Sequence, residues 1–108
     1  MLKILTEIQR LQNELGQWST QTFGHRTNPS GPINHLKKEV EELAQKPLDP
    51  TEYADCLLLL LDAWRIAGGS ADQLVVNAFD KLAVNKQRDW GAVDGDGVVE
   101  HVRKGTEP

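Results

Sequence analysis

Two pairs of carboxylates are the residues of this sequence whose type and spacing could do chemistry. Glu39 and Glu42 form one pair, and Glu52 and Asp55 form the other. A spacing of three residues places both members of a pair on the same side of a helix. Carboxylate oxygens suit Mg²⁺ or Mn²⁺, and these ions also bind the phosphates of a substrate. The two pairs therefore indicate a divalent-cation site that acts on a phosphorylated compound.

Asp55 is the most informative of the four, because it stands within an apolar run of alanine, cysteine and leucine. An unpaired carboxylate in the core is costly, so we expect Asp55 at or near the core with a specific partner. The other three have simpler explanations that stay open. Glu39 and Glu42 could be solvated surface, and Glu52 follows Asp49 by three residues, so it could close a capping box.

A polar stripe near the end of the helical region could hold phosphate oxygens. Lys81, Asn85 and Arg88 follow each other at helical spacings, whereas Lys86 lies on a different side of an ideal helix. A solvated helix face would show the same pattern. Trp18, which precedes a glycine- and proline-rich loop, could stack on a nucleobase or could belong to the core.

Four helices are expected to position these groups. Apolar spacing and breaker residues predict helices over 2–22, from 32 or 33 to 46, over 50–67, and from a Ser70 cap toward Trp90. Asp49 and Pro50 are suited to the N-cap and the first position of the third helix. The expected core positions include Ile4, Ile8, Leu11, Leu15 and Trp18 in the first helix and Leu74, Val75, Ala78, Phe79 and Leu82 in the fourth.

The short loop before the third helix predicts that the second and third helices are antiparallel neighbours, which would gather both carboxylate pairs into one cluster. Beyond residue 90 the sequence is rich in turn-forming residues, and we expect an extended tail with a short strand-like piece over Val98–Val102. The predicted organisation is an all-α domain over residues 1–90 and a C-terminal tail over 91–108.

Composition limits the partners and the compartment. A net charge of -4 disfavours nucleic acid, whose backbone is bound by clustered Lys and Arg. The longest apolar run is far short of the roughly 20 residues that span a bilayer, so no membrane association is expected. A single cysteine, Cys56, allows no disulfide within one chain. Because the N-terminus also lacks the features of a secretory signal, we expect a cytoplasmic protein.

The segments HLKKEVEEL, EYADCLLLLLDA and KLAVNKQRDWG resemble the all-α MazG-like nucleoside triphosphate pyrophosphohydrolases. They are most similar to a small phage-associated branch that acts on purine deoxynucleotides, dGTP and dATP, which would place the chain in the host cytoplasm. The resemblance implies a four-helix bundle completed by a second subunit, and hence a homodimer or homotetramer. Lys38 stands where many relatives have a further glutamate, which leaves the number of metal ions open.

The resemblance also assigns roles to residues. It implies that Glu39, Glu42, Glu52 and Asp55 bind the catalytic Mg²⁺ ions, which Mn²⁺ can replace. Lys81, Asn85, Lys86 and Arg88 match the segment that contacts phosphates and sugar.

The expected reaction is attack of water on the α-phosphorus of a nucleoside triphosphate, which yields the monophosphate and pyrophosphate. Glu42 and Glu39 are the first candidates for the group that accepts the proton. Two alternatives stay open. One is a non-catalytic helical interaction module with an acidic, cation-binding patch. The other is the same enzyme class acting on pyrimidine or damaged nucleotides.

Overall fold

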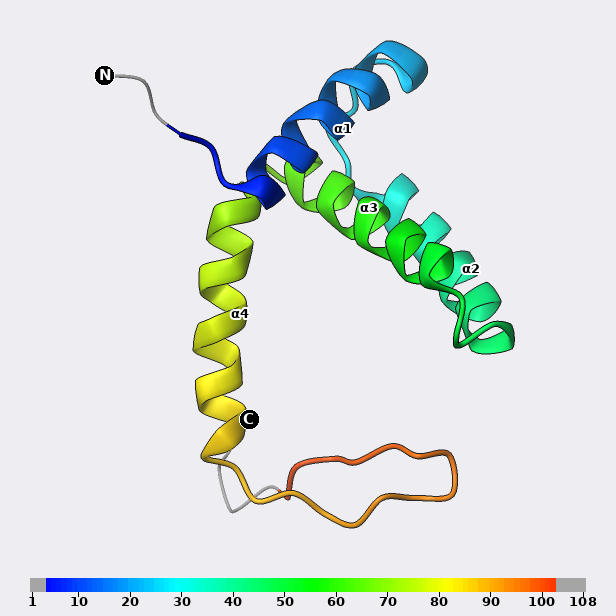
Figure 1. The fold of residues 1–108 in the computed structure, drawn as a ribbon, viewed down its shortest axis with the longest axis vertical. Helices are drawn as coiled ribbons and strands as arrows, with labels where there is room; N and C mark the ends of the chain where they lie inside the picture. Colours follow the sequence, from blue (N-terminus) through cyan, green and yellow to red (C-terminus); the bar gives the residue numbers. More distant parts are fainter. Residues whose placement is uncertain (1–3, 103–108) are drawn as a thin grey trace. The chain divides into compact units, whose positions relative to one another are not determined.

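The structure, a computed structural model, describes residues 4–102, and its regular secondary structure is entirely helical over that range. The helices are α1 (Glu7–Phe23), α2 (Ser30–Gln45), α3 (Pro50–Ile66) and α4 (Ala71–Lys86), as Figure 1 shows. The predicted all-α class is therefore confirmed. The described residues form two compact units, which divide between Leu74 and Val75, and each is described by itself.

α1 begins later than the sequence predicted. Thr6 is its N-cap, and the Thr6 hydroxyl accepts a hydrogen bond from the Gln9 amide at 3.2 Å. Threonine is a favoured N-cap residue because its side chain replaces a missing backbone partner. Residues 4–6 are consequently outside the helix and the prediction was wrong for them, while residues 2 and 3 lie outside the described range.

The other helix ends follow the capping rules closely. Asp49 caps α3 and accepts hydrogen bonds from the Thr51 amide at 2.9 Å and the Thr51 hydroxyl at 2.6 Å. Gly68, with φ of 98°, follows the last residues of α3. Ser70 accepts from the Gln73 amide at 3.2 Å at the start of α4. α2 differs slightly, since it starts at Ser30 rather than at residue 32 or 33.

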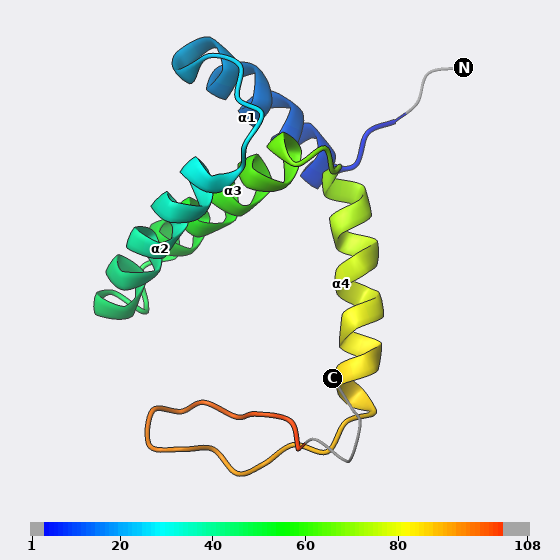
Figure 2. The same cartoon turned by 180° about the vertical axis from the view of Figure 1, so that it is seen from behind.

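In the first unit, α3 packs against both α1 and α2 (Figures 1 and 2). α2 and α3 run antiparallel, as their short connection predicted. Leu61 of α3 and Ala71 are fully buried, and Ala63 is nearly so. The packing of α2 on α3 brings carboxylate side chains of the two helices close to one another.

The buried face of α1 is polar and small, which the sequence did not predict. Gln12, Gly16 and Ser19 are its buried residues, whereas Ile4 and Trp18, expected in the core, are 92% and 56% exposed. Gln12 donates to the carbonyls of Leu61 and Gly69 at 3.3 and 3.2 Å and accepts from the Ala71 amide at 2.7 Å. The Gln12 side chain therefore links α1 by hydrogen bonds to the Leu61 carbonyl of α3 and to Gly69 and Ala71 after it.

The α4 prediction was also wrong about burial. Phe79 and Leu82, expected on a buried side, are 69% and 48% exposed in this chain. An apolar helical stripe indicates that a face tends to be covered, but it does not indicate that the same chain covers it.

In the second unit, the segment after α4 folds back on itself. Trp90 forms an isolated antiparallel bridge with His101, and the Gly91 amide donates to the Glu100 carbonyl at 2.9 Å. The Trp90 indole N–H donates to the Asn85 carbonyl at 2.8 Å, which ties this segment to the end of α4. Residues 103–108 of the expected tail lie outside the described range. The predicted boundary between the helical domain and the tail, at residue 90, stays a prediction. Within residues 4–102, none of the helices has the length and apolar character that crossing a bilayer requires.

Candidate active site

The antiparallel packing of α2 on α3 brings three carboxylates together. One oxygen each from Glu39, Glu52 and Asp55 lies within 4.8 Å of the other two. Two oxygens bound to one Mg²⁺ at its usual bond length are at most about 4.2 Å apart, so small side-chain movements would let one ion contact all three. These residues could hold a hard divalent cation, and oxygen is the donor atom that such a cation prefers.

Glu52 is the buried member of this cluster, with 8% of its surface exposed. Its Oε2 atom is buried and has no hydrogen-bond partner among the described residues. The capping-box alternative fails, because the Asp49 amide donates to the Lys46 carbonyl at 3.1 Å. A buried carboxylate oxygen without a partner is costly, and a bound cation would remove that cost. The donor set therefore fits a metal ion.

Glu39 is half-buried, and its acidic neighbours affect its pKa. Burial raises the pKa of Glu39, and the hydrogen bond and charge of Glu42 and the charge of Asp55 raise that pKa further. His35 acts in the opposite direction, with its Nε2 atom 3.2 Å from Glu39 Oε1. Glu42 is exposed and lies beside Glu39 rather than in the three-oxygen cluster. The expected place of Asp55 at or near the core was wrong, since Asp55 is exposed and lines a cavity.

That cavity has a volume of about 360 Å³ and lies within the first unit, between α1, α2, α3 and the loop that joins α1 to α2. Asp55 and Asp62 both line it from α3. Seven residues of helix make about two turns and about 10 Å of length, so these two carboxylates mark opposite ends of one helix face. Its lining residues are Leu15, Trp18, Phe23, Arg26, Gly31, Pro32, His35, Glu39, Asp55, Leu58, Leu59 and Asp62.

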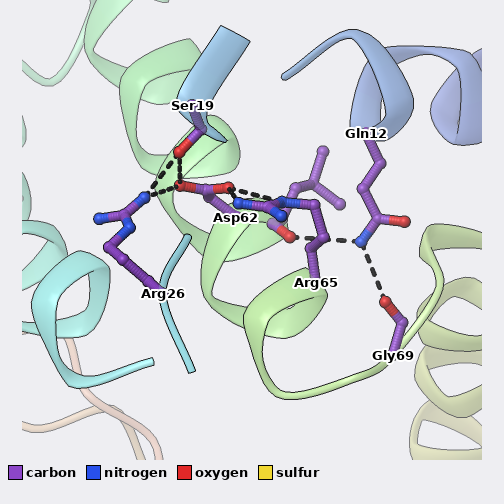
Figure 3. Close-up of polar contacts among 7 residues, drawn as sticks. Gln12, Ser19, Arg26, Asp62, Arg65 and Gly69 are labelled. Carbon is purple, nitrogen blue, oxygen red and sulfur yellow. Dashed lines mark hydrogen bonds and ion pairs between the residues drawn. The ribbon is translucent and has the colours of Figure 1, made fainter. Parts of the chain in front are cut away.

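The end of the cavity near Asp62, the arginine end, holds a fully paired carboxylate (Figure 3). Asp62 is 5% exposed. Its Oδ2 atom accepts from Arg26 Nη2 at 2.7 Å and from the Ser19 hydroxyl at 2.8 Å. Its Oδ1 atom accepts from Arg65 Nε at 2.9 Å and lies 2.8 Å from Arg65 Nη2. Two arginines and a hydroxyl therefore neutralise this carboxylate and fix its orientation.

Sequence reasoning missed the Asp62 group, although a signal for it existed. Asp55 and Asp62 stand on either side of the same leucine run and, seven residues apart, lie on the same helix face. Its partner Arg26 lies 36 residues earlier, in the breaker-rich loop, where no periodicity connects the two.

Aromatic side chains line the same end of the cavity. Trp18 and Phe23 meet edge to face with ring centroids 5.4 Å apart. The Arg26 guanidinium lies 5.1 Å from the centroid of the Phe23 ring, within the range of a cation–π contact. Trp18 is thus a cavity-wall residue rather than a core residue, and its contact with a nucleobase stays a prediction.

The predicted phosphate-contacting residues lie in the second unit. Lys81, Asn85 and Lys86 are on α4, and Arg88 follows its end. Lys81 and Lys86 are exposed, whereas Asn85 and Arg88 are half-buried. Their role in binding stays a prediction.

Comparison with known proteins decides the family. The model of the dATP/dGTP pyrophosphohydrolase family matches residues 11–107. The chain belongs to this family. A dATP/dGTP diphosphohydrolase of Salmonella phage PMBT28 is 36% identical over 102 residues, which make up 94% of this chain and 32% of that protein. The Eaa protein of Salmonella phage P22 is 43% identical over 84 residues, or 78% of this chain and 26% of that protein. This pyrophosphohydrolase-family chain thus spans about a third or less of both Salmonella phage relatives.

A third relative has a similar length. The dATP/dGTP diphosphohydrolase of cyanophage S-2L is 32% identical over 97 residues, which cover 88% of each chain. The solved structure of the cyanophage S-2L MazG-like pyrophosphohydrolase, bound to dGDP and three catalytic Mn²⁺ ions per active site, matches with a TM-score of 0.71 and 32% identity. The match covers 92% of this family member and 100% of that chain. The MazG-like family and fold expected from the sequence are confirmed.

Proposed function

We propose that this chain hydrolyses a purine deoxynucleoside triphosphate, dGTP or dATP, to the monophosphate and pyrophosphate. The observation that carries the proposal is the meeting of Glu39, Glu52 and Asp55 within 4.8 Å in a chain of this family. The names of the phage relatives support the substrate, and the dGDP and Mn²⁺ in the cyanophage structure support the metal dependence.

Glu39, Glu52 and Asp55 would hold the divalent ions, with Glu42 beside them, and Mg²⁺ or Mn²⁺ would serve. Such ions, when bound, polarise phosphate oxygens and lower the pKa of a bound water. The buried Oε2 atom of Glu52 supports this assignment, because it has no hydrogen-bond partner among the described residues and a bound cation would offset the cost of burying it.

The protein's own residues would bind and orient the nucleotide. The carboxylate end of the cavity takes the phosphates, and the nucleoside lies along α3 toward the arginine end, where Trp18 stacks on the base. Leu58 and Leu59 form an apolar wall that excludes water from the nucleoside. Glu42 accepts the proton of the attacking water, since it contacts Glu39 but lies outside the three-oxygen cluster, and Glu39 is the second candidate.

The residues that the sequence assigned to phosphate and sugar binding keep that role in the proposal. Lys81, Asn85, Lys86 and Arg88 supply donors for phosphate and sugar oxygens.

Self-association is part of the proposal. Apolar side chains of the first unit, among them Val40, Leu57 and Leu60, are 41–49% exposed in the single chain. A second copy that covers such side chains would give a homodimer or homotetramer, and light scattering after size-exclusion chromatography measures which one forms. We place the protein in the cytoplasm of the host cell.

A direct assay tests the activity. Purified protein with Mg²⁺ or Mn²⁺ is expected to release pyrophosphate from dGTP or dATP, and in ¹⁸O-labelled water the label is expected in the monophosphate. Label in the released pyrophosphate would move the attack away from the α-phosphorus. Absence of pyrophosphate from every nucleoside triphosphate, pyrimidine and damaged nucleotides included, would favour the non-catalytic interaction module.

A further inference from the structure

The arginine end of the cavity holds a donor that the proposed reaction does not use. Arg26 anchors itself through Nη2 alone, which donates to Asp62 at 2.7 Å and to Ser19 at 2.6 Å. Within residues 4–102, Nη1 makes no hydrogen bond, and the buried Nε atom has no partner either. The side chain lines the cavity and is 28% exposed. A fixed guanidinium whose Nη1 group makes no hydrogen bond therefore lines the space for the nucleoside.

The same end offers no comparable side-chain acceptor. Both oxygens of Asp62 are already occupied, one by Arg26 and Ser19 and the other by Arg65. The remaining side chains there are aromatic or apolar, apart from the Trp18 indole N–H, which is also a donor. The side chains at the arginine end therefore favour a base edge that presents acceptors.

The two purines differ at that edge. Guanine presents two neighbouring acceptors, O6 and N7, whereas adenine presents the N7 acceptor beside the N6 amino donor. A donor placed against this edge hydrogen-bonds to O6 and N7 of guanine. In adenine the same donor faces the N6 amino group, which is also a donor. Discrimination of this kind is strong, because it leaves a buried polar group unpaired in the disfavoured complex.

We propose that Arg26, held in place by Asp62 and Ser19, donates from Nη1 to the O6/N7 edge of guanine and so makes this chain prefer 6-oxopurine over 6-aminopurine nucleotides. The proposal rests on the proposed function and adds to it the residue that selects the base. Phe23, whose ring lies 5.1 Å from the guanidinium, limits the movement of Arg26 from the side.

Nucleotide analogues test the proposal on the unaltered protein. The kcat/KM for dGTP is expected to exceed that for dATP by at least about tenfold. The deoxynucleoside triphosphate of hypoxanthine, which keeps O6 and N7 but lacks the 2-amino group, is expected to behave like dGTP. That of 2,6-diaminopurine, which has the 2-amino group but no O6, is expected to behave like dATP. The reverse order would assign selection to the 2-amino group and would overturn the proposal.

Two arginine variants give a matched comparison. Arg26→Gln removes the proposed donor, whereas Arg65→Gln removes the other arginine on the same carboxylate. The two side chains are equally exposed at 28%, but Arg65 does not line the cavity. Arg26→Gln is expected to lower the ratio of kcat/KM for dGTP to that for dATP about tenfold, mainly because kcat/KM for dGTP falls. Arg65→Gln is expected to keep the ratio while lowering the melting temperature comparably.

The outcomes separate the two proposals. If Arg26→Gln slows the hydrolysis of dGTP and dATP equally, Arg26 acts on a part of the nucleotide that both substrates share. The assignment of base selection to Arg26 is then overturned, while the proposed function stands. If the variant does not fold, the analogue series on the unaltered protein decides alone. Absence of pyrophosphate from every nucleotide overturns the proposed function together with the base assignment.

Discussion

Gly16 of α1 lies directly against the Arg65 side chain of α3. A Cβ atom at Gly16 would come within 2.7 Å of Arg65 Cδ and 3.1 Å of Arg65 Nε. Arg65 cannot easily move away, because Nε donates to Asp62 at 2.9 Å and Nη2 lies 2.8 Å from the same carboxylate. Glycine inside a helix costs about 0.5–1 kcal/mol relative to alanine. Its presence at this position is explained by the room that Arg65 needs.

Gly16→Ala is therefore expected to lower the free energy of unfolding by about 1–2 kcal/mol, despite the better helix propensity of alanine. Urea unfolding measures the change. In an Arg65→Ala background the same substitution is expected to raise stability by about 0.5–1 kcal/mol, because only the propensity gain remains. Equal stabilisation in both backgrounds would show that the contact with Arg65 is unimportant.

The contrast between Asp55 and Asp62 shows how far the sequence predicted the site. Spacing and the flanking helices predicted one cluster of four carboxylates, and the structure brings Glu39, Glu52 and Asp55 together while Glu42 lies outside that group. Burial was assigned to Asp55, whereas of these two aspartates it is Asp62 that is buried. The two residues have similar local sequence, and only the distant partner of Asp62 distinguishes them. Contacts made across a loop leave no periodic signal.

Gln12 is the second long-range contact that the sequence did not reveal, and it gives a stability prediction. Its side chain is 3% exposed and satisfies the Leu61 and Gly69 carbonyls and the Ala71 amide. Gln12→Leu keeps a similar volume but removes these hydrogen bonds and leaves the buried Ala71 amide without its partner. The free energy of unfolding is expected to fall by about 2–4 kcal/mol. Asn13→Leu, at an exposed neighbouring position, is the control and should change stability little.

Faster hydrogen exchange at the Ala71 amide in Gln12→Leu would locate the loss, because that amide donates to Gln12 at 2.7 Å. An unchanged exchange rate there would contradict this account of the α1 contact.

The fold was predicted best where a single residue carries the signal. Asp49, Pro50 and Ser70 mark helix starts through their own side chains, so the first residues of α3 and α4 could be predicted from the sequence. Burial depends on what covers a face, and for that reason the stripe with Trp18 in α1 and the stripe with Phe79 in α4 misled. An apolar stripe carries no information about which surface will cover it.

Asp49 gives a pH-dependent prediction. Hydrogen bonds from Thr51 hold the pKa of Asp49 below its ordinary value of 3.8. A carboxylate with a lowered pKa in the folded state stabilises fully above pH 3.8 and loses that contribution as the pH falls through the folded-state pKa. Asp49→Ala should lower the melting temperature by a few degrees at neutral pH.

Asp49→Asn separates capping from charge, because asparagine caps helices about as well as aspartate but does not titrate. Its melting temperature at neutral pH should stay close to that of the unaltered protein. Below pH 4 its melting temperature should fall less steeply with pH. If the melting temperatures of the two proteins fall equally with pH, titration of Asp49 does not contribute to the loss of stability in acid.

Glu52 gives the prediction that tests the metal site most directly. Its buried Oε2 lacks a partner among residues 4–102, and its carboxylate faces those of Glu39 and Asp55. Without added ions, Glu52→Gln is expected to raise the melting temperature, because it removes one of three mutually repelling charges. With Mn²⁺ the order is expected to reverse, since the unaltered protein gains stability from the ion and the variant gains little. Pyrophosphate release should fall at least about a hundredfold, because even outer-shell partners of metal ligands cost 10–100-fold.

Glu41→Gln is the control for this prediction, because Glu41 is exposed on α2 and lies outside the three-oxygen cluster, although the substitution removes the same charge. It should keep both the Mn²⁺-induced rise in melting temperature and the activity. If Glu52→Gln keeps a full Mn²⁺ response, the ion binds elsewhere, and the buried oxygen of Glu52 needs another explanation. A general charge effect would instead move Glu41→Gln and Glu52→Gln together, so the difference between the two variants isolates the contribution of the cluster.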